Sequence, residues 1–272
     1  MSDLAPRVAS GIVMVVLALG ALELGGHWFV AFWLIAGAVV FWEWLGLSGC
    51  ERRVLIASLG AGVLACLAAL SANAAADFAC LALVVAAVAI AFLERRGRWV
   101  WAASGLVYAG ILVIAVISLR MSLLHGKLAI LWLFAVVWMT DILAYFGGRL
   151  IGGPKLWPRV SPSKTWSGFL TGVLGGALAG AVVLTLNLPE GQRAIPVFLL
   201  LGIVAGAISQ GGDLLESSIK RRFGAKDSSN LIPGHGGFMD RLDGFAAAAA
   251  AAGFAGLLRG GTINPATGLL LW

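Results

Sequence analysis

Residues 127–148, KLAILWLFAVVWMTDILAYFGG, decide the structural class of this protein. Only Lys127 and Asp141 are charged in this stretch, and a helix needs about 20 mostly apolar residues to cross the hydrocarbon core of a bilayer. The whole chain of 272 residues has a similar composition, because 60% of it is hydrophobic and 12% is charged. Soluble domains average roughly 25% charged residues. We therefore expect an integral membrane protein that contacts the lipid bilayer.

Charged and turn residues divide the chain into nine apolar segments of sufficient length. They predict an all-α polytopic membrane protein with about nine transmembrane helices. The segments are residues 8–24, 28–48, 53–71, 75–93, 99–119, 127–148, 167–188, 194–214 and 238–258. No linker or repeat of convincing period separates them, so we expect residues 1–272 to form a single integral-membrane domain.

The distribution of basic residues predicts the orientation. With the N-terminus in the cytoplasm, the inward loops hold 15 of the 19 basic residues, and only Arg120, Lys127, Arg193 and Arg259 remain outside. Positively charged loops are retained on the cytoplasmic side, so we expect a cytoplasmic N-terminus and an external C-terminus. The net charge of +6 lies in short clusters between apolar runs and forms no continuous basic stripe, so we expect no nucleic-acid partner.

The two halves of the chain differ in where their polar residues lie. Residues 1–126 have short loops and few polar residues within their spans, and we expect them to be an apolar helical scaffold. Residues 127–272 include two long inward loops, 149–166 and 215–237, and charges within or beside the spans. We expect this half to be the catalytic one, with its active-site loops on the cytoplasmic side.

Asp141 is the acid that composition explains least. A carboxylate within a span costs at least about 2.5 kcal/mol unless it is paired, hydrated or close to the surface. It is either a structural hydrogen-bonding group near the cytoplasmic end of its helix or a functional acid. Glu23 and Glu43 are weaker cases, because each lies near the end of its span and can reach an interface. We assign them no role.

The start of the seventh span combines two patterns. A glycine recurs every fourth residue on one helical face, at Gly168, Gly172, Gly176 and Gly180. This spacing favours close helix packing, either within one chain or between two chains. A homodimer is therefore one of two alternatives. Just before this helix, Ser161, Lys164 and Thr165 flank a proline turn that can hold an anion. A plain turn with a lysine that anchors at the interface fits equally well.

The densest group of charges lies in residues 212–243, GDLLESSIKRRFGAKDSSNLIPGHGGFMDRLD. Asp213 and Glu216 are three residues apart and share a helical face, and Asp240 and Asp243 repeat this spacing. Carboxylates hold Mg²⁺, which bridges to substrate phosphates, while lysine and arginine neutralise the remaining phosphate charge. The segment therefore indicates phosphoryl or nucleotidyl transfer at the membrane surface. The alternative is a solvated loop whose basic residues bind anionic lipid head groups.

A glycine-rich stretch precedes the ninth span. Gly236 and Gly237 allow backbone amides to approach a ligand, and the N-terminus of the following helix adds positive potential. His235, beside them, would be a weak signal alone.

From Ser218 onward the sequence follows the pattern S-x-[apolar]-K-R-x4-K-D-x-[small]-x2-[apolar]-P-x-H-G-G-[apolar]-x-D-R-[apolar]-D. This pattern closely resembles the signature of the phosphatidate cytidylyltransferase family, also called CDP-diacylglycerol synthases. The resemblance continues upstream through Asp213, the SPSKT loop at 161–165 and Asp141. It departs from the family at Ser163 and Ser167, where members commonly have a second lysine and an acid.

The resemblance implies that CTP and phosphatidic acid react to CDP-diacylglycerol and pyrophosphate, with Mg²⁺ required. It implies Asp213 and Asp240 as the leading metal ligands, with Asp243 third and Asp141 able to complete the shell. Lys220 and Arg241 would act with these acids at the reacting phosphates. The substrate-binding residues would be Ser161, Lys164, Thr165, Ser218, Arg221, Lys226, Asp227, His235, Gly236 and Gly237.

A competing function is an ion-coupled membrane transporter that uses Asp141 and the cluster from Asp213 to Asp243 as its pathway. Transporters typically place midplane polar residues in corresponding positions of two repeats, whereas these residues lie near one surface of one half. The family resemblance and the nine spans further predict the bacterial inner membrane, with the active site facing the cytoplasm.

Overall fold

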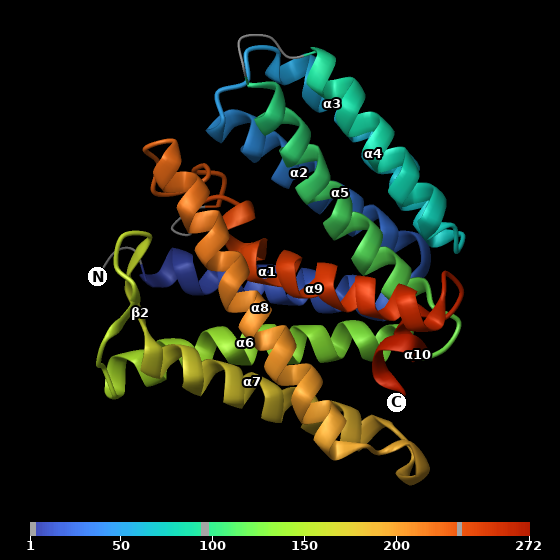
Figure 1. Ribbon diagram of the computed structural model, residues 1–272, viewed down its shortest axis with the longest axis vertical. Helices are drawn as coiled ribbons and strands as arrows, with labels where there is room; N and C mark the ends of the chain where they lie inside the picture. The colour runs from blue at the N-terminus through green and yellow to red at the C-terminus, as the bar shows by residue number, and fades with distance from the viewer. Residues whose placement is uncertain (1–3, 94–97, 233–235) are drawn as a thin grey trace. The chain divides into compact units, whose positions relative to one another are not determined.

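A computed structural model describes residues 4–93, 98–232 and 236–272 of the chain (Figure 1). Its helices are α1 (Leu4–Leu24), α2 (Gly26–Leu47), α3 (Arg53–Ala72), α4 (Ala76–Leu93), α5 (Trp99–Met121), α6 (Gly126–Leu150), α7 (Trp166–Asn187), α8 (Ile195–Arg222), α9 (Met239–Gly260) and α10 (Pro265–Leu270). A short 3-10 turn, η1 (Glu190–Gln192), precedes α8. The strands β1 (Lys155–Trp157) and β2 (Ser161–Thr165) form an antiparallel hairpin.

The prediction of an all-α polytopic membrane protein is confirmed. Each predicted segment coincides with one of the helices α1 to α9. Within the described residues, the eight helices α2 to α9 are long and apolar enough to cross a membrane, whereas the apolar part of α1, Ala9–Leu24, is shorter.

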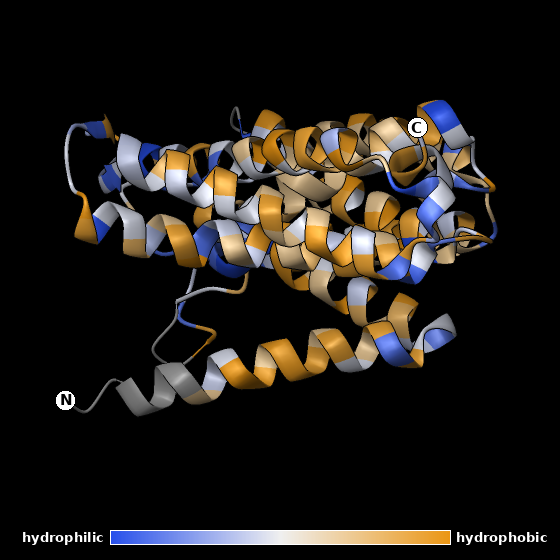
Figure 2. Ribbon diagram, turned by 90° about the horizontal axis from the view of Figure 1, so that it is seen from below, coloured by the Kyte–Doolittle hydropathy of each residue, from blue (hydrophilic) through white to orange (hydrophobic). Residues whose placement is uncertain are grey.

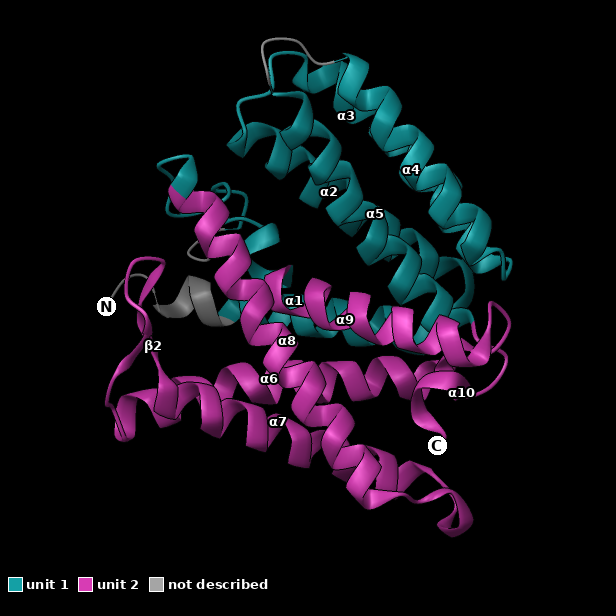
Figure 3. Cartoon of the chain, in the orientation of Figure 1, with its two compact units in different colours: residues 1–121, 222–242 teal, residues 122–221, 243–272 magenta. Residues whose placement is uncertain are grey.

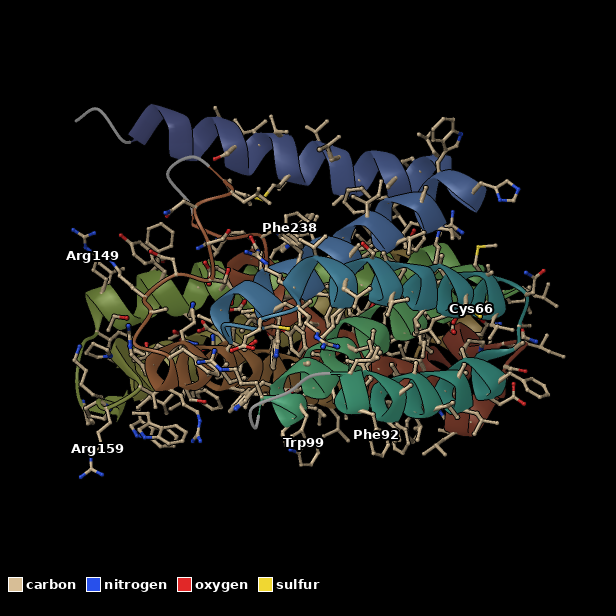
Figure 4. The ribbon with its side chains drawn as sticks, turned by 90° about the horizontal axis from the view of Figure 1, so that it is seen from above. Cys66, Phe92, Trp99, Arg149, Arg159 and Phe238 are labelled. Atoms are coloured by element: carbon tan, nitrogen blue, oxygen red, sulfur yellow. The ribbon has the colours of Figure 1, made fainter. Side chains whose placement is uncertain are left out.

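The surface of the helices is apolar, as a lipid environment requires. Hydrophobic residues run along most of the length of the helices, and hydrophilic ones gather in loops and near helix ends (Figure 2). Phe92 is 85% exposed and Trp99 is 51% exposed, and both side chains extend away from the ribbon (Figure 4). Such exposed apolar side chains are suited to contact lipid.

The chain divides into two compact units (Figure 3). Unit 1 comprises residues 1–121 and 222–242, and unit 2 comprises residues 122–221 and 243–272. The division near residue 121 lies close to the expected boundary at 126, but residues 222–242 group with the N-terminal helices. The predicted scaffold half therefore folds together with part of the segment that carries the signature.

In unit 1, α5 packs against α2, α3 and α4. Small residues permit this packing where aromatic rings approach a backbone. A Cβ at Gly105 of α5 would collide with the indole of Trp44 in α2, and one at Gly60 of α3 would collide with the ring of Phe41.

In unit 2, α6 and α7 lie side by side (Figure 1). The predicted glycine face of α7 is turned toward α6. A Cβ at Gly172 would lie 2.6 Å from the carbonyl oxygen of Thr140, and one at Gly176 would lie 2.7 Å from that of Val136. The face therefore serves packing within the chain, which was one of its two expected uses.

Two predicted inward loops contain regular structure. The loop 149–166 holds the β1–β2 hairpin, whose strands are too short to give a periodic signal. The loop predicted to begin at residue 215 is helical as far as Arg222, because loss of hydrophobicity ends a membrane span without ending its helix. An ion pair between Glu216 and Lys220, one turn apart, supports this extension of α8.

Candidate active site

Asp213 on α8 forms an ion pair with Lys164 on β2. Its Oδ2 lies 2.6 Å from the Nζ of Lys164 on β2, and the two side chains are 33% and 19% exposed. Lys164 also donates to Oε1 of Gln210 at 3.2 Å, and the Ser217 hydroxyl donates to Oδ1 of Asp213 at 3.3 Å. The pair therefore joins the SPSKT strand to α8 and remains partly accessible.

Asp243 on α9 brings a second carboxylate into the same electrostatic environment. The charges of Asp213, Asp141 and Lys220 act on it, the two acids repelling its carboxylate and the lysine attracting it. Gly212 makes the approach of α8 to α9 possible, because a Cβ there would lie 2.7 Å from the carbonyl oxygen of Asp243. Asp141 on α6 thus adds a further negative charge near Asp243, and its role stays a prediction.

Lys220 and Glu216 follow Asp213 by about two turns and one turn of α8, respectively, and form a buried pair. Their charged atoms are 2.5 Å apart, and the side chains are 10% and 2% exposed. Two charges removed from water to this degree need each other, because either one alone would be left buried and uncompensated. The ammonium group of Lys220 is therefore paired with the Glu216 carboxylate.

In unit 1, Asp240 organises the segment that precedes α9. It is 8% exposed. The backbone N–H of Ser228 donates to Oδ1 and Oδ2 of Asp240 at 3.2 and 3.0 Å, and the N–H of Gly237 donates to Oδ2 at 2.8 Å. Gly236 has a φ of 82°, a conformation that glycine adopts readily. The first acid of the D-R-[apolar]-D pattern thus binds the backbone of its own loop.

Glu43 on α2 also binds the segment that precedes α9. It is 1% exposed and accepts hydrogen bonds from the hydroxyls of Ser228 and Ser229 and from the backbone N–H groups of Phe238 and Met239. The expectation that Glu43 reaches an interface is wrong. Its partners are 185 to 196 residues away in sequence, so no local pattern could reveal them.

The donor types of unit 2 suit Mg²⁺ bound together with a substrate. Within the described residues, no group of three or more His, Cys, Asp or Glu side chains is arranged to hold a metal ion. Mg²⁺ usually needs only one or two carboxylates, because waters and substrate phosphates supply the remaining oxygens. Asp213 and Asp243 match that requirement.

Comparisons with known proteins identify the family. The chain matches the model of the cytidylyltransferase family over residues 5–257. It belongs to this family. It is similar to the phosphatidate cytidylyltransferase of Brucella abortus biovar 1, with 41% identity over 252 residues that cover 92% of each chain. It is 44% identical to the Haemophilus influenzae enzyme of that name over 126 residues, which cover 46% of this chain and 44% of the relative. The Staphylococcus haemolyticus enzyme of that name is 46% identical over 116 residues, or 43% and 44% of the two chains.

Several residues that the family signature singles out form hydrogen bonds with other groups of this chain. Thr165 caps α7, because its Oγ1 accepts the N–H of Gly168 at 3.1 Å. Ser218 donates to the carbonyl oxygen of Leu215 at 2.7 Å. The N–H of Gly237, expected to approach a ligand, donates to Asp240 instead.

The other signature residues of the family stay predictions as substrate contacts. The exposed ones are Arg221, Lys226, Asp227 and Arg241, while Ser161 is half-buried. His235 lies outside the described residues. At the positions where this member departs from the common pattern, Ser163 is exposed, and Ser167 donates to the carbonyl oxygen of Gly152.

Proposed function

We propose that this chain transfers a cytidylyl group from CTP to phosphatidic acid and releases CDP-diacylglycerol and pyrophosphate. The observation that carries the proposal is the 41% identity to the Brucella abortus phosphatidate cytidylyltransferase over 92% of both chains. The cluster of Asp213, Asp243 and Lys164 supplies the charges that transfer between phosphates needs. The family match favours this enzyme over the transporter.

The reaction requires no covalent intermediate on the protein. An oxygen of the lipid phosphate attacks the α-phosphorus of CTP and forms a new P–O bond. The bond from this phosphorus to the oxygen that bridges to the β-phosphorus breaks, and its electron pair leaves with pyrophosphate. Catalysis of this type depends on positioning and on stabilising charge.

Lys164 is suited to such a role. Its ammonium group sits against Asp213 and remains partly exposed, so it can rotate from the carboxylate to a phosphate oxygen. In the proposed reaction it orients the phosphates and counters the charge that moves to the leaving group. Lys220, which interacts with Asp243 and pairs with Glu216, offsets part of the negative charge of the acids.

Asp213 and Asp243 would hold Mg²⁺, with Asp141 as a third acid. When bound, the ion neutralises negative charge on the triphosphate. Asp240 was expected among the leading metal ligands, but its three contacts with backbone amides favour a role in holding its loop. We therefore propose Asp213 and Asp243 as the ligands to test first.

The proposal is tested with the purified protein in detergent, radiolabelled CTP and phosphatidic acid. We expect label to enter the chloroform-soluble lipid only when phosphatidic acid and Mg²⁺ are both present. Addition of EDTA should stop the incorporation, and excess Mg²⁺ should restore it. If folded protein transfers no label, the proposed reaction is wrong. If transfer is insensitive to EDTA, the Mg²⁺ requirement is wrong and the reaction stands.

We further propose that the protein resides in a bacterial plasma membrane with its active site facing the cytoplasm. The similarity to bacterial relatives and the excess of basic residues in the inward loops support this orientation. A reporter fused after Trp272 should be read on the external side, and a cytoplasmic signal would contradict it. The glycine face gives a homodimer no support, because α6 of the same chain meets it.

A further inference from the structure

Glu43 lies in a helix to which the sequence assigns no chemistry. It belongs to the segment Trp42–Glu43–Trp44 near the end of α2, among apolar neighbours. A buried carboxylate that is not hydrogen-bonded would strongly destabilise the fold, and Glu43 is 1% exposed. Among the described residues, the groups that donate hydrogen bonds to Glu43 lie at Ser228, Ser229, Phe238 and Met239.

Both oxygens of Glu43 accept hydrogen bonds from these groups. Oε1 accepts from the Ser229 hydroxyl at 2.5 Å and from the Phe238 N–H at 2.9 Å. Oε2 accepts from the Ser228 hydroxyl at 3.3 Å and from the Met239 N–H at 2.6 Å. Four donors around two oxygens match a carboxylate, which only accepts, and do not match an amide, whose nitrogen only donates.

Two of these donors lie at the N-terminus of α9. Met239 is the first residue of that helix, and its N–H has no acceptor within the helix. A negative charge near this end also interacts favourably with the helix dipole. Glu43 thus caps α9 from another helix and fixes the residue at which α9 begins.

The segment that precedes α9 fits closely around the carboxylate. A Cβ at Gly237 would lie 3.0 Å from each Glu43 oxygen and would collide with the Ser228 hydroxyl. Arg53 on α3 interacts electrostatically with Glu43 and stacks on the ring of Trp42, with its Cζ 3.8 Å from the ring centroid. Charge and space are therefore both matched to a glutamate at position 43.

We propose that Glu43 is a positioning residue for the segment formed by residues 223–232 and 236–238 of the proposed cytidylyltransferase. This segment carries Lys226 and Asp227, which the sequence predicts as substrate contacts. Asp240 holds it through the backbone of Ser228 and Gly237, and Glu43 holds it through three further hydrogen bonds. A fourth hydrogen bond joins Glu43 to Met239, the residue that follows this segment. The effect on catalysis rests on the proposed function, whereas the anchoring itself does not.

The anchor is tested first without substrate. Lys226 and Arg222 are exposed, so trypsin can cleave the segment when it opens. In detergent-purified protein we expect Glu43→Gln to accelerate cleavage after Lys226 by at least tenfold, as assigned by mass spectrometry. Glu43→Asp should have a smaller effect because it keeps an acceptor-only group. Glu190→Gln is the matched control, because the Glu190 side chain is 91% exposed.

Kinetics then separate positioning from general stability. Measured per folded protein and well below Tm, Glu43→Gln should lower kcat/KM for CTP by about 30-fold, and Glu43→Asp should recover part of it. If Glu43→Gln does not fold, Ser229→Ala removes one donor and should accelerate cleavage by a smaller factor. Unchanged cleavage in the folded variants overturns the anchor. Faster cleavage with unchanged kcat/KM overturns the positioning role.

The two proposals fail in different ways. If the parent protein transfers no label from CTP but Glu43→Gln opens the segment, the proposed function is wrong and the anchor stands. If the parent protein is active and Glu43→Gln lowers activity without opening the segment, the anchor is wrong and the proposed function stands.

Discussion

The acids of the two units have different kinds of partner. In unit 1, Glu43 and Asp240 accept hydrogen bonds from backbone amides and serine hydroxyls of one segment. In unit 2, Asp213 is paired with the flexible side chain of Lys164 and interacts with Asp243. Backbone donors cannot leave without unfolding their segment, whereas a lysine can rotate to a new partner. We conclude that Glu43 and Asp240 hold structure, whereas Asp213 is suited to exchange its partner for a substrate.

The largest effect is expected from Asp213→Asn or Asp243→Asn. Either change removes one negative charge from the proposed metal-binding pair and should lower kcat by about 100-fold or more, a loss typical of removing one charge-stabilising group. For Asp213→Asn, Tm should change by only a few degrees, because Asp213 is partly exposed. Label transfer from CTP measures the first quantity and thermal unfolding the second. Near-normal kcat in both variants would show that neither Asp213 nor Asp243 takes part in catalysis.

Substitutions of Lys164 test whether its ammonium group contacts phosphate as well as Asp213. Lys164→Ala should lower kcat/KM for CTP by about tenfold or more, since it loses a charge-assisted contact with phosphate. Lys164→Arg should retain more activity because it preserves the positive charge. Equal activity of the alanine and arginine variants would show that the ammonium serves only to hold the hairpin on α8.

A third prediction concerns packing in unit 2. Gly176→Ala should destabilise the protein by roughly 1–3 kcal/mol, because the new Cβ meets the Val136 carbonyl at 2.7 Å and forces α6 and α7 apart. Gly62→Ala on α3 is the matched control, since a Cβ there meets nothing within 4 Å. It should be neutral or stabilising. Equal Tm values for the two variants would contradict the close approach of α6 and α7.

The sequence predicts this fold well where the signal is local. Span lengths and the glycine spacing of α7 are properties of single segments, and they identify the helices and one packing face. The acids Asp141, Asp213 and Asp243 stand out because charge is scarce in an apolar chain. What determines the function of a carboxylate, however, is its partner. Glu43 resembled an interfacial acid because its donors lie on a segment nearly 200 residues away.

The smallest effect is expected at Thr165, for which the sequence and the structure indicate different roles. The resemblance implies a substrate contact, while the structure shows an N-cap whose hydroxyl oxygen accepts the Gly168 N–H. Thr165→Val removes that acceptor and should cost about 1 kcal/mol, lowering Tm by a few degrees. Thr165→Ser retains the acceptor and should restore Tm. A capping role also predicts that kcat/KM per folded protein changes by less than threefold in both variants. If Thr165→Val instead lowers kcat/KM tenfold at an unchanged Tm, the hydroxyl contacts substrate, and the distinction between structural and exchangeable groups must be drawn again within the SPSKT strand.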